Sequence, residues 1–271
     1  MNYSFLTYGE FTLPYLTFGE GSEMLFAFHG FGRTAEDFKV FENTLGKKYT
    51  IVAFDIFYHG EHALSLDNHL PTFELSVMAR LIEKFMWERK RVKFSLMGYS
   101  FGGKIVLGIV QKMSPRIKEV FLLAPDGLKT NPLYFFLSNT VLGNWILRGI
   151  VRKPDLVFKF NNLLMRWKLI HEKVHEFIND KLVEEHYRKL VYRTWLTFRF
   201  YDPSLPVVAK HINSRKIRIK MFFGKHDFIT PSWLGSRFQK KLRRKNSMVI
   251  LDCGHRIFVK ADEIAKIILE D

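Results

Sequence analysis

A serine stands between glycines in the pentapeptide Gly98-Tyr99-Ser100-Phe101-Gly102. This Gly-x-Ser-x-Gly pattern follows an apolar run typical of a strand and precedes one typical of a buried helix. A sharp turn from strand to helix projects a serine side chain outward, and glycines two residues to either side avoid collisions at such a turn. The chemistry that this arrangement predicts is nucleophilic attack by the Ser100 hydroxyl.

Two residues far along the chain could activate that serine. A serine hydroxyl is a weak nucleophile until a base takes its proton, and a histidine base needs a carboxylate to hold its tautomer. Asp227 and His255 each closely follow a predicted strand, where open α/β sheets place their sites. The chain order Ser100, Asp227, His255 is the order expected after this kind of turn. Asp126 also follows a predicted strand and is the alternative acid.

Backbone N–H groups could stabilise the negative charge that such a reaction builds on the substrate oxygen. One donor is expected to be the N–H of Phe101, and the other the N–H of Phe31 in an early glycine-rich segment. His29 is expected to brace this early loop rather than to transfer protons. The residues expected to support the two turns are His29, Gly30, Gly32, Gly98 and Gly102.

Short apolar runs predict the strands that must position these residues. In the first half of the chain they fall at 11–18, 24–28, 50–54, 92–97 and 117–123. Residues 34–45 predict a helix with Thr34 as its N-cap. Strands alternating with helices indicate βαβ units and therefore a parallel sheet. The alternation lapses between about 126 and 210 and resumes with strands at 217–223 and 248–251.

The predicted fold class is therefore α/β, with a mostly parallel central sheet flanked by helices and a helical cap inserted into it. The predicted core comprises residues 1–126 and 211–271, and the predicted cap comprises 127–210. The cap opens with an apolar stretch, 132–151, which predicts a helix that is buried between cap and core, lines an acyl pocket or touches a bilayer. Two asparagines, two glycines and an arginine in this stretch argue against a transmembrane span.

These motifs together resemble the α/β-hydrolase fold, in its capped serine-hydrolase branch. The resemblance covers nearly the whole chain, although the cap matches only in position and helical character. Segment 55–60 is similar to a family loop of Asp, a short spacer, His and Gly, but has Tyr58 where glycine is usual, which is expected to affect loop shape and not chemistry. The segments that carry the resemblance are 29–32, 98–103, 224–227 with Pro231, and 254–255.

The resemblance implies acyl transfer through a covalent intermediate. Ser100 would attack a carbonyl, His255 would shuttle the proton, and water would release the acyl group, without a cofactor. Phenylalanines in the cap favour an apolar acyl substrate, so the predicted activity is that of an esterase-like or lipase-like carboxylic ester hydrolase. Carbon–carbon bond hydrolases, lyases and acyltransferases with the same triad are the alternative. An inactive hydrolase-fold binding protein is less favoured, because Asp227 and the other two triad residues are all present.

Metal and disulfide chemistry find little support in the sequence. Residues 171–175 have the His-Glu-x-x-His spacing of zinc enzymes, but no third ligand follows at the expected distance, so no metal site is predicted. The single cysteine, Cys253, excludes an intramolecular disulfide and fits a reducing compartment. No signal-peptide pattern opens the chain, and the predicted location is cytoplasmic.

The 271 residues carry a net charge of +15, which is unevenly distributed. Residues 1–125 hold 14 bases and 13 acids, 126–210 hold 14 and 8, and 211–271 hold 14 and 6. No nucleic-acid motif accompanies the bases, so no nucleic-acid partner is predicted. The excess predicts a basic outer face, and the expected partners are a small acyl substrate and, weakly, an anionic membrane surface. The oligomeric state is left open.

Overall fold

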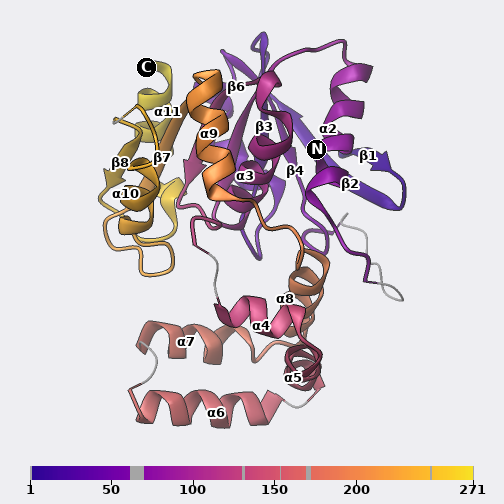
Figure 1. Cartoon of the computed structure of the whole chain (residues 1–271), viewed down its shortest axis with the longest axis vertical. Coiled ribbons are helices and arrows are strands. Elements are labelled where there is room, and N and C mark those ends of the chain that lie inside the picture. The colour runs from indigo at the N-terminus through magenta and orange to yellow at the C-terminus, as the bar shows by residue number, and fades with distance from the viewer. Residues whose placement is uncertain are drawn as a thin grey trace. The chain divides into compact units, whose positions relative to one another are not determined.

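The computed structural model describes residues 2–61, 70–129, 132–152, 154–168, 172–244 and 246–270. Its strands form an eight-stranded sheet in the order β1-β2-β4-β3-β5-β6-β7-β8 (Figure 1). The β1–β2 and β2–β4 pairs are antiparallel and the others are parallel, which confirms the predicted α/β class. The strands are β1 (Ser4–Tyr8), β2 (Phe11–Phe18), β3 (Glu23–Phe28), β4 (Tyr49–Phe54), β5 (Phe94–Tyr99), β6 (Ile117–Leu123), β7 (Arg218–Gly224) and β8 (Met248–Leu251).

Strand β1 was not predicted from the sequence. Only Leu6 among its residues is buried, so the segment lacks the apolar run that marks a buried strand. Antiparallel pairing with β2 holds it in place, with Ser4 opposite Tyr15 and Tyr8 opposite Phe11. Its conformation therefore depends on a partner strand rather than on its own residue pattern.

Helices lie against the sheet through two sets of apolar side chains. Leu25 and Ala27 of β3 belong to one cluster with α1 (Glu42–Leu45) and α11 (Ala261–Glu270). Because successive strand side chains point to opposite faces, Phe26 lies on the other face, where its ring packs on Phe85 of α2 with ring centroids 5.2 Å apart. The other helices of this sheet unit are α2 (Leu75–Glu88), α3 (Phe101–Met113), α9 (Leu205–Arg215), α10 (Trp233–Gln239) and the 3₁₀ segments η1 (Ala35–Phe41), η2 (Ser114–Arg116) and η3 (Ile257–Lys260).

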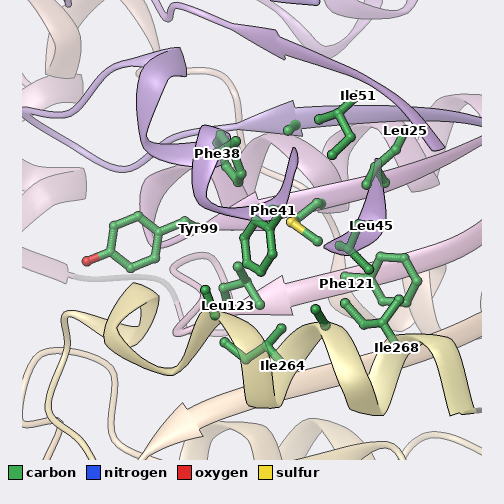
Figure 2. Packing of buried hydrophobic residues seen from close by; sticks show 14 of the residues in the cluster. Leu25, Phe38, Phe41, Leu45, Ile51, Tyr99, Phe121, Leu123, Ile264 and Ile268 are labelled. Carbon is green, nitrogen blue, oxygen red and sulfur yellow. The ribbon is translucent and has the colours of Figure 1, made fainter. Parts of the chain in front are cut away.

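Figure 2 shows the first cluster, in which Ile264 and Ile268 of α11 pack toward Phe121 and Leu123 of β6. Phe41, from the end of η1, lies among the same side chains and is completely buried. Residues from the N-terminal, central and C-terminal thirds of the chain thus share one core. That core fixes the sheet whose strand ends carry the candidate site.

The helix predicted over 34–45 is present as two helical segments, but its predicted N-cap bond is not. The structure has the 3₁₀ segment η1 followed by the short helix α1, and the Thr34 side chain makes no capping hydrogen bond. The carboxylate of Asp55, directly after β4, instead accepts the Ala35 N–H at 2.6 Å. The hydrogen bond from the Ala35 N–H to Asp55, twenty residues further along the chain, therefore replaces the capping bond that was expected from Thr34.

The chain divides into two compact units. The sheet unit comprises Met1–Ser65, Phe73–Lys129 and Tyr201–Asp271, and the helical unit comprises Leu66–Thr72 and Thr130–Phe200. The boundaries predicted at 126 and 211 stay predictions, and α9 belongs to the sheet unit. The helical unit contains α4 (Pro132–Asn139), α5 (Val141–Arg152), α6 (Pro154–Arg166), α7 (Glu172–Lys181) and α8 (Glu185–Thr197).

The apolar stretch from Pro132 onward forms two helices and not the single helix predicted. Thr140 separates them, since its hydroxyl accepts the Gly143 N–H at 2.9 Å and so caps the start of α5. Gly143 packs so closely on the Phe136 carbonyl that a Cβ there would overlap it. In the part of the chain that the structure describes, no helix has the length and apolar character needed to cross a bilayer.

The turn between β5 and α3 has an unusual backbone. Ser100 lies between the two elements with φ 49° and ψ −116°, a region that side-chain-bearing residues rarely occupy. A Cβ at Gly98 would come within 2.5 Å of the Gly102 carbonyl oxygen, and a Cβ at Gly102 would overlap the Phe28 carbonyl of β3. The glycines therefore let the helix approach the sheet closely, while the serine carries the strain.

We expect Ser100→Gly to be more stable than Ser100→Ala by about 1 kcal/mol, because glycine adopts a positive φ without a Cβ penalty. Both variants lose the serine hydroxyl, so their difference isolates the backbone. Ser114, at the other end of α3, has φ −48° and ψ −32° and provides the matched control. There Gly should be less stable than Ala by about 0.5–1 kcal/mol. Urea unfolding measures both differences, and the same sign at both positions would contradict a strained turn.

Candidate active site

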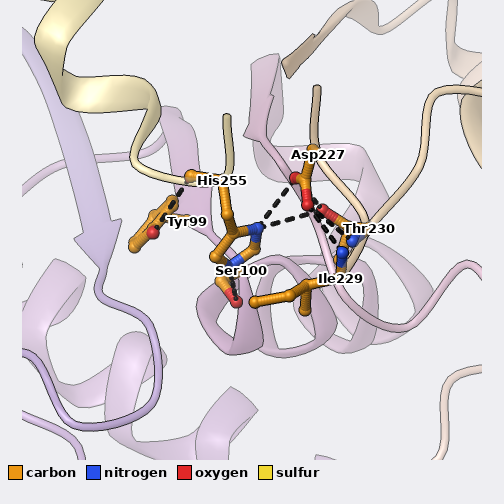
Figure 3. A network of polar contacts seen from close by, with 6 residues as sticks. All are labelled: Tyr99, Ser100, Asp227, Ile229, Thr230 and His255. Carbon is orange, nitrogen blue, oxygen red and sulfur yellow. Dashed lines mark hydrogen bonds and ion pairs between the residues drawn. The ribbon is translucent and has the colours of Figure 1, made fainter. Parts of the chain in front are cut away.

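Three side chains from different strand ends meet in one hydrogen-bonded row. The Ser100 hydroxyl lies 3.0 Å from Nε2 of His255, and Nδ1 of His255 lies 2.8 Å from Oδ2 of Asp227 (Figure 3). Asp227 follows β7, and His255 follows β8. The parallel strands end at the same edge of the sheet, which brings together residues that are 155 positions apart in the chain.

The Asp227 carboxylate is buried and held by several donors. The backbone N–H groups of Ile229 and Thr230 donate to its Oδ1 at 2.8 and 3.0 Å, and the Thr230 hydroxyl donates to its Oδ2 at 2.7 Å. Burial by itself would raise the pKa of Asp227, but the hydrogen bonds from His255 and Thr230 outweigh it and lower that pKa below its usual value. The carboxylate is thus ionised and oriented toward the histidine.

Asp126, the alternative acid, is engaged elsewhere. Its side chain is exposed, and its Oδ1 accepts the Gly127 N–H at 2.7 Å. Its backbone N–H donates to the carbonyl of Ser100 at 2.8 Å, which supports the turn rather than the histidine. The structure places Asp227, and not Asp126, within hydrogen-bond distance of His255.

The early glycine-rich loop lies against the serine turn. A Cβ at Gly30 would come within 2.9 Å of the Tyr99 ring and 3.1 Å of the Ser100 Cβ, so the two backbones approach closely. Gly32 has φ 69°, a conformation that favours glycine. Phe31 lies in this loop, and Phe101 is the first residue of α3. Their N–H groups as oxyanion donors stay a prediction.

His29 connects this loop to the neighbouring strand end. Its side chain is completely buried, with Nδ1 2.7 Å from the Gly30 carbonyl oxygen and Nε2 2.9 Å from the Ile56 nitrogen. Nδ1–H therefore donates and Nε2 accepts, which requires the neutral ring. Burial, together with repulsion from His59, lowers the pKa of His29 well below its usual value. These contacts connect the loop to the end of β4, and the role of His29 as a support of the loop rather than a proton carrier stays a prediction.

Tyr58, which stands where the similar family loop usually has glycine, has an unusual backbone conformation. Tyr58 has φ 69°, so a tyrosine occupies the left-handed conformation that glycine adopts most easily. Gly60, two residues later, has φ 77°. The loop thus turns twice through backbone that disfavours side chains.

Two residues in contact with Asp227 or His255, Thr230 and Tyr99, were not predicted from the sequence. Thr230 supplies the hydroxyl that holds Asp227, and its Oγ1 is also 3.4 Å from Nδ1 of His255. Tyr99 lies on the other side of the histidine, where its hydroxyl donates to the His255 carbonyl at 3.2 Å and its ring packs on Phe258. Burial raises the pKa of Tyr99 to about 12, so this donor keeps its proton. Figure 3 shows both residues beside His255. The only sequence signal for these two residues was their position beside motif residues, since Tyr99 precedes Ser100 and Thr230 precedes Pro231.

The His-Glu-x-x-His motif gives no metal site in the described residues. His171 itself lies outside them. Nε2 of His175 lies 2.8 Å from Oδ1 of Asn162 and 3.2 Å from Nδ2 of Asn179. Within the described ranges, no group of three or more His, Cys, Asp or Glu residues could hold a metal ion.

Curated relatives match short parts of this chain. A dihydrolipoyllysine-residue acetyltransferase component of an acetoin cleaving system from Cupriavidus necator is 27% identical over 125 residues, which are 46% of this chain and 32% of the relative. A putative esterase/lipase 2 from Mycoplasma pneumoniae is 31% identical over 98 residues, which are 36% of this chain and 35% of the relative. Each match thus spans about a third of the relative's length.

Comparisons over the whole chain agree with the observed architecture. A thermophilic esterase from Thermogutta terrifontis superimposes with a TM-score of 0.71 at 15% identity, covering 100% of this chain and 97% of the esterase. That similarity concerns the fold alone. The family profile described as alpha/beta hydrolase fold matches residues 24–262. The chain therefore belongs to the α/β-hydrolase fold family.

Proposed function

We propose that this protein is a serine hydrolase that cleaves carboxylic esters of apolar acyl groups. The observation that carries the proposal is the hydrogen-bonded row of Ser100, His255 and Asp227 at the edge of the sheet. In the proposed roles, Ser100 is the nucleophile, His255 is the general base and acid, and Asp227 orients the histidine. The names of an esterase and an esterase/lipase among similar proteins support the ester as the substrate class.

Each step of the proposed reaction has a group to perform it. Ser100 Oγ attacks the ester carbonyl carbon while its proton passes to Nε2 of His255. The tetrahedral intermediate collapses as the histidine returns that proton to the departing alcohol, leaving an acyl-serine. Water then attacks the acyl carbon while one of its protons passes to Nε2. The bond between the acyl carbon and Oγ breaks as Nε2 returns that proton to Oγ, which releases the carboxylic acid and restores the Ser100 hydroxyl. Asp227 stays ionised throughout and stabilises the imidazolium through its bond to Nδ1.

The proposed oxyanion site consists of backbone donors at the two closely packed turns. Phe101 begins α3, so its N–H belongs to the helix N-terminus, where the partial positive charge favours an anion. Phe31 lies in the loop whose Gly30 approaches Ser100. Donors built into a rigid backbone need no rearrangement as negative charge develops, which is why they lower the barrier.

The first test is covalent labelling of the serine. Wild-type protein should react with a fluorophosphonate probe, and Ser100→Ala should not, because the activated hydroxyl is gone. Ser114→Ala provides the matched control, since Ser114 is a buried serine at the other end of α3. Labelling is measured by in-gel fluorescence. Equal labelling of Ser100→Ala and wild type would exclude Ser100 as the nucleophile.

The second test separates the two acids. Asp227→Asn should lower kcat by about 10⁴-fold, because an asparagine cannot hold the reactive tautomer of His255 or stabilise its cation. Asp126→Asn is the matched control and should keep kcat close to the wild-type value, because the Asp126 side chain contacts its own turn. Steady-state kinetics on one ester measure both variants. A larger loss in Asp126→Asn than in Asp227→Asn would reverse the assignment.

The third test concerns the substrate. We expect kcat/KM on p-nitrophenyl esters to rise with acyl chain length, because each buried methylene contributes about 0.8 kcal/mol. Ser100→Ala gives the background rate. Turnover of a vinylogous diketone, with none of any ester, would favour the carbon–carbon hydrolase alternative. A preference for the shortest ester would contradict an apolar acyl substrate.

A further inference from the structure

Helix α5 exposes apolar side chains that its own unit leaves uncovered. Val141 is 90% exposed, Leu142 57% and Trp145 71%. Arg148 and Arg152 follow at helical spacing on the same side of α5, and both are exposed. These five residues are called the α5 surface below. Its apolar half precedes its basic half along the helix.

The opposite side of α5 already has its partners. Leu147 is almost completely buried in a cluster with Leu137 of α4 and Leu196 of α8. Gly143 packs against the backbone of α4. The core of the helical unit thus uses the other side of α5, and the α5 surface is left for a different contact. Arg148 is oriented by a hydrogen bond from its Nε to the Tyr192 hydroxyl at 3.1 Å.

Bases outnumber acids in the sequence segment that contains this surface. Residues 132–168 contain six Lys and Arg but one acid, Asp155, whereas 172–200 contain six bases and five acids. A second exposed tryptophan, Trp167, lies between Arg166 and Lys168, which are also exposed. Among the described residues of the helical unit, the exposed tryptophans Trp145 and Trp167 thus both lie within 141–168, the segment in which bases outnumber acids.

We propose that the α5 surface binds to an anionic phospholipid membrane. Tryptophan favours the boundary between headgroups and acyl chains, and Val141 and Leu142 add apolar side chains that can enter the same layer. Arginine pairs with lipid phosphates and is attracted by the negative surface potential. At 12 residues, α5 would be about 18 Å long, too short to cross the hydrocarbon layer, so it would lie in the plane of the surface.

Charge complementarity favours an anionic membrane over a second copy of the chain as the partner of the α5 surface. A second copy of the chain would bring another basic surface against the first, and like charges repel. No other long segment of the sequence carries a net negative charge, since residues 1–125 hold 14 bases and 13 acids, 172–200 hold six and five, and 211–271 hold 14 and 6. A membrane rich in acidic lipids provides both the negative charge and an apolar layer. This inference does not depend on the proposed hydrolysis.

Vesicle sedimentation tests the proposal. The full chain carrying Ser100→Ala, which cannot consume ester lipids by the proposed chemistry, should bind vesicles of phosphatidylcholine with phosphatidylglycerol more tightly than pure phosphatidylcholine. In that background Arg152→Gln should weaken binding to the mixed vesicles by about fivefold, the effect of one base near such a surface. Trp145→Ala should weaken it by at least as much. Added salt should weaken the binding of the parent protein.

Two matched controls remove the same residue types elsewhere. Trp87 of α2 is 82% exposed and precedes Arg89-Lys90-Arg91, so Trp87→Ala tests whether any exposed tryptophan near bases is sufficient. Arg243, exposed in the sheet unit, provides Arg243→Gln as the charge control. Both controls should bind like the parent. Thermal unfolding shows whether each variant is folded, and unchanged labelling of its Ser100-containing counterpart shows that the sheet unit is intact.

Several results would overturn the proposal. Equal binding to neutral and mixed vesicles, or no binding to either, would exclude an anionic membrane as the partner. Loss of binding in Trp87→Ala or Arg243→Gln as large as in Trp145→Ala would place the contact elsewhere. If Trp145→Ala instead converts a dimer to a monomer in analytical ultracentrifugation while vesicle binding is absent, the α5 surface belongs to an interface between copies.

Discussion

The close approach of α3 to β3 is the constraint on which the candidate site depends. Gly102 lies against the Phe28 carbonyl, where no larger residue fits, and this holds the N-terminus of α3 beside the loop that follows β3. Ser100 must therefore complete the turn in a conformation with positive φ. The strain at one residue is offset by packing throughout the core around it, as is usual where geometry serves chemistry.

Hydrogen bonds extend that rigidity from the turn to the other strand ends. Asp227 is held by Thr230, His255 is bounded by Asp227 on one side and Tyr99 on the other, and His29 fastens the glycine-rich loop. Each of these groups is largely buried, so each bond forms in a low dielectric and resists exchange with water. Such a network orients the side chains before any substrate arrives, which is the condition for electrostatic preorganisation.

The helical unit differs from the sheet unit in how its apolar side chains are packed and exposed. Among the described residues, its core cluster around Leu137, Leu147 and Leu196 is smaller than the cluster around α11, and α5 leaves tryptophan and aliphatic side chains exposed beside arginines. The sheet unit contains a set of closely packed buried aromatic residues, for example Phe28 stacked on Phe54 with ring centroids 5.4 Å apart. The sheet unit thus holds the candidate site on a closely packed scaffold, whereas the α5 surface of the helical unit is the one proposed to bind an anionic membrane.

Residue type and order were enough to predict the α/β class, the serine turn and the candidates Asp227 and His255, because buried parallel strands and glycine turns leave local patterns. Features that depend on individual tertiary or side-chain contacts left no such pattern. The strand β1, the cap that Asp55 gives to η1, the break at Thr140 and the positions of Thr230 and Tyr99 became visible only in the folded chain. The sequence favoured Asp227 over Asp126 as the partner of His255, although both acids follow strands. Only the fold brings the Asp227 carboxylate to 2.8 Å from His255, because β7 and β8 are parallel neighbours that end at the same edge of the sheet.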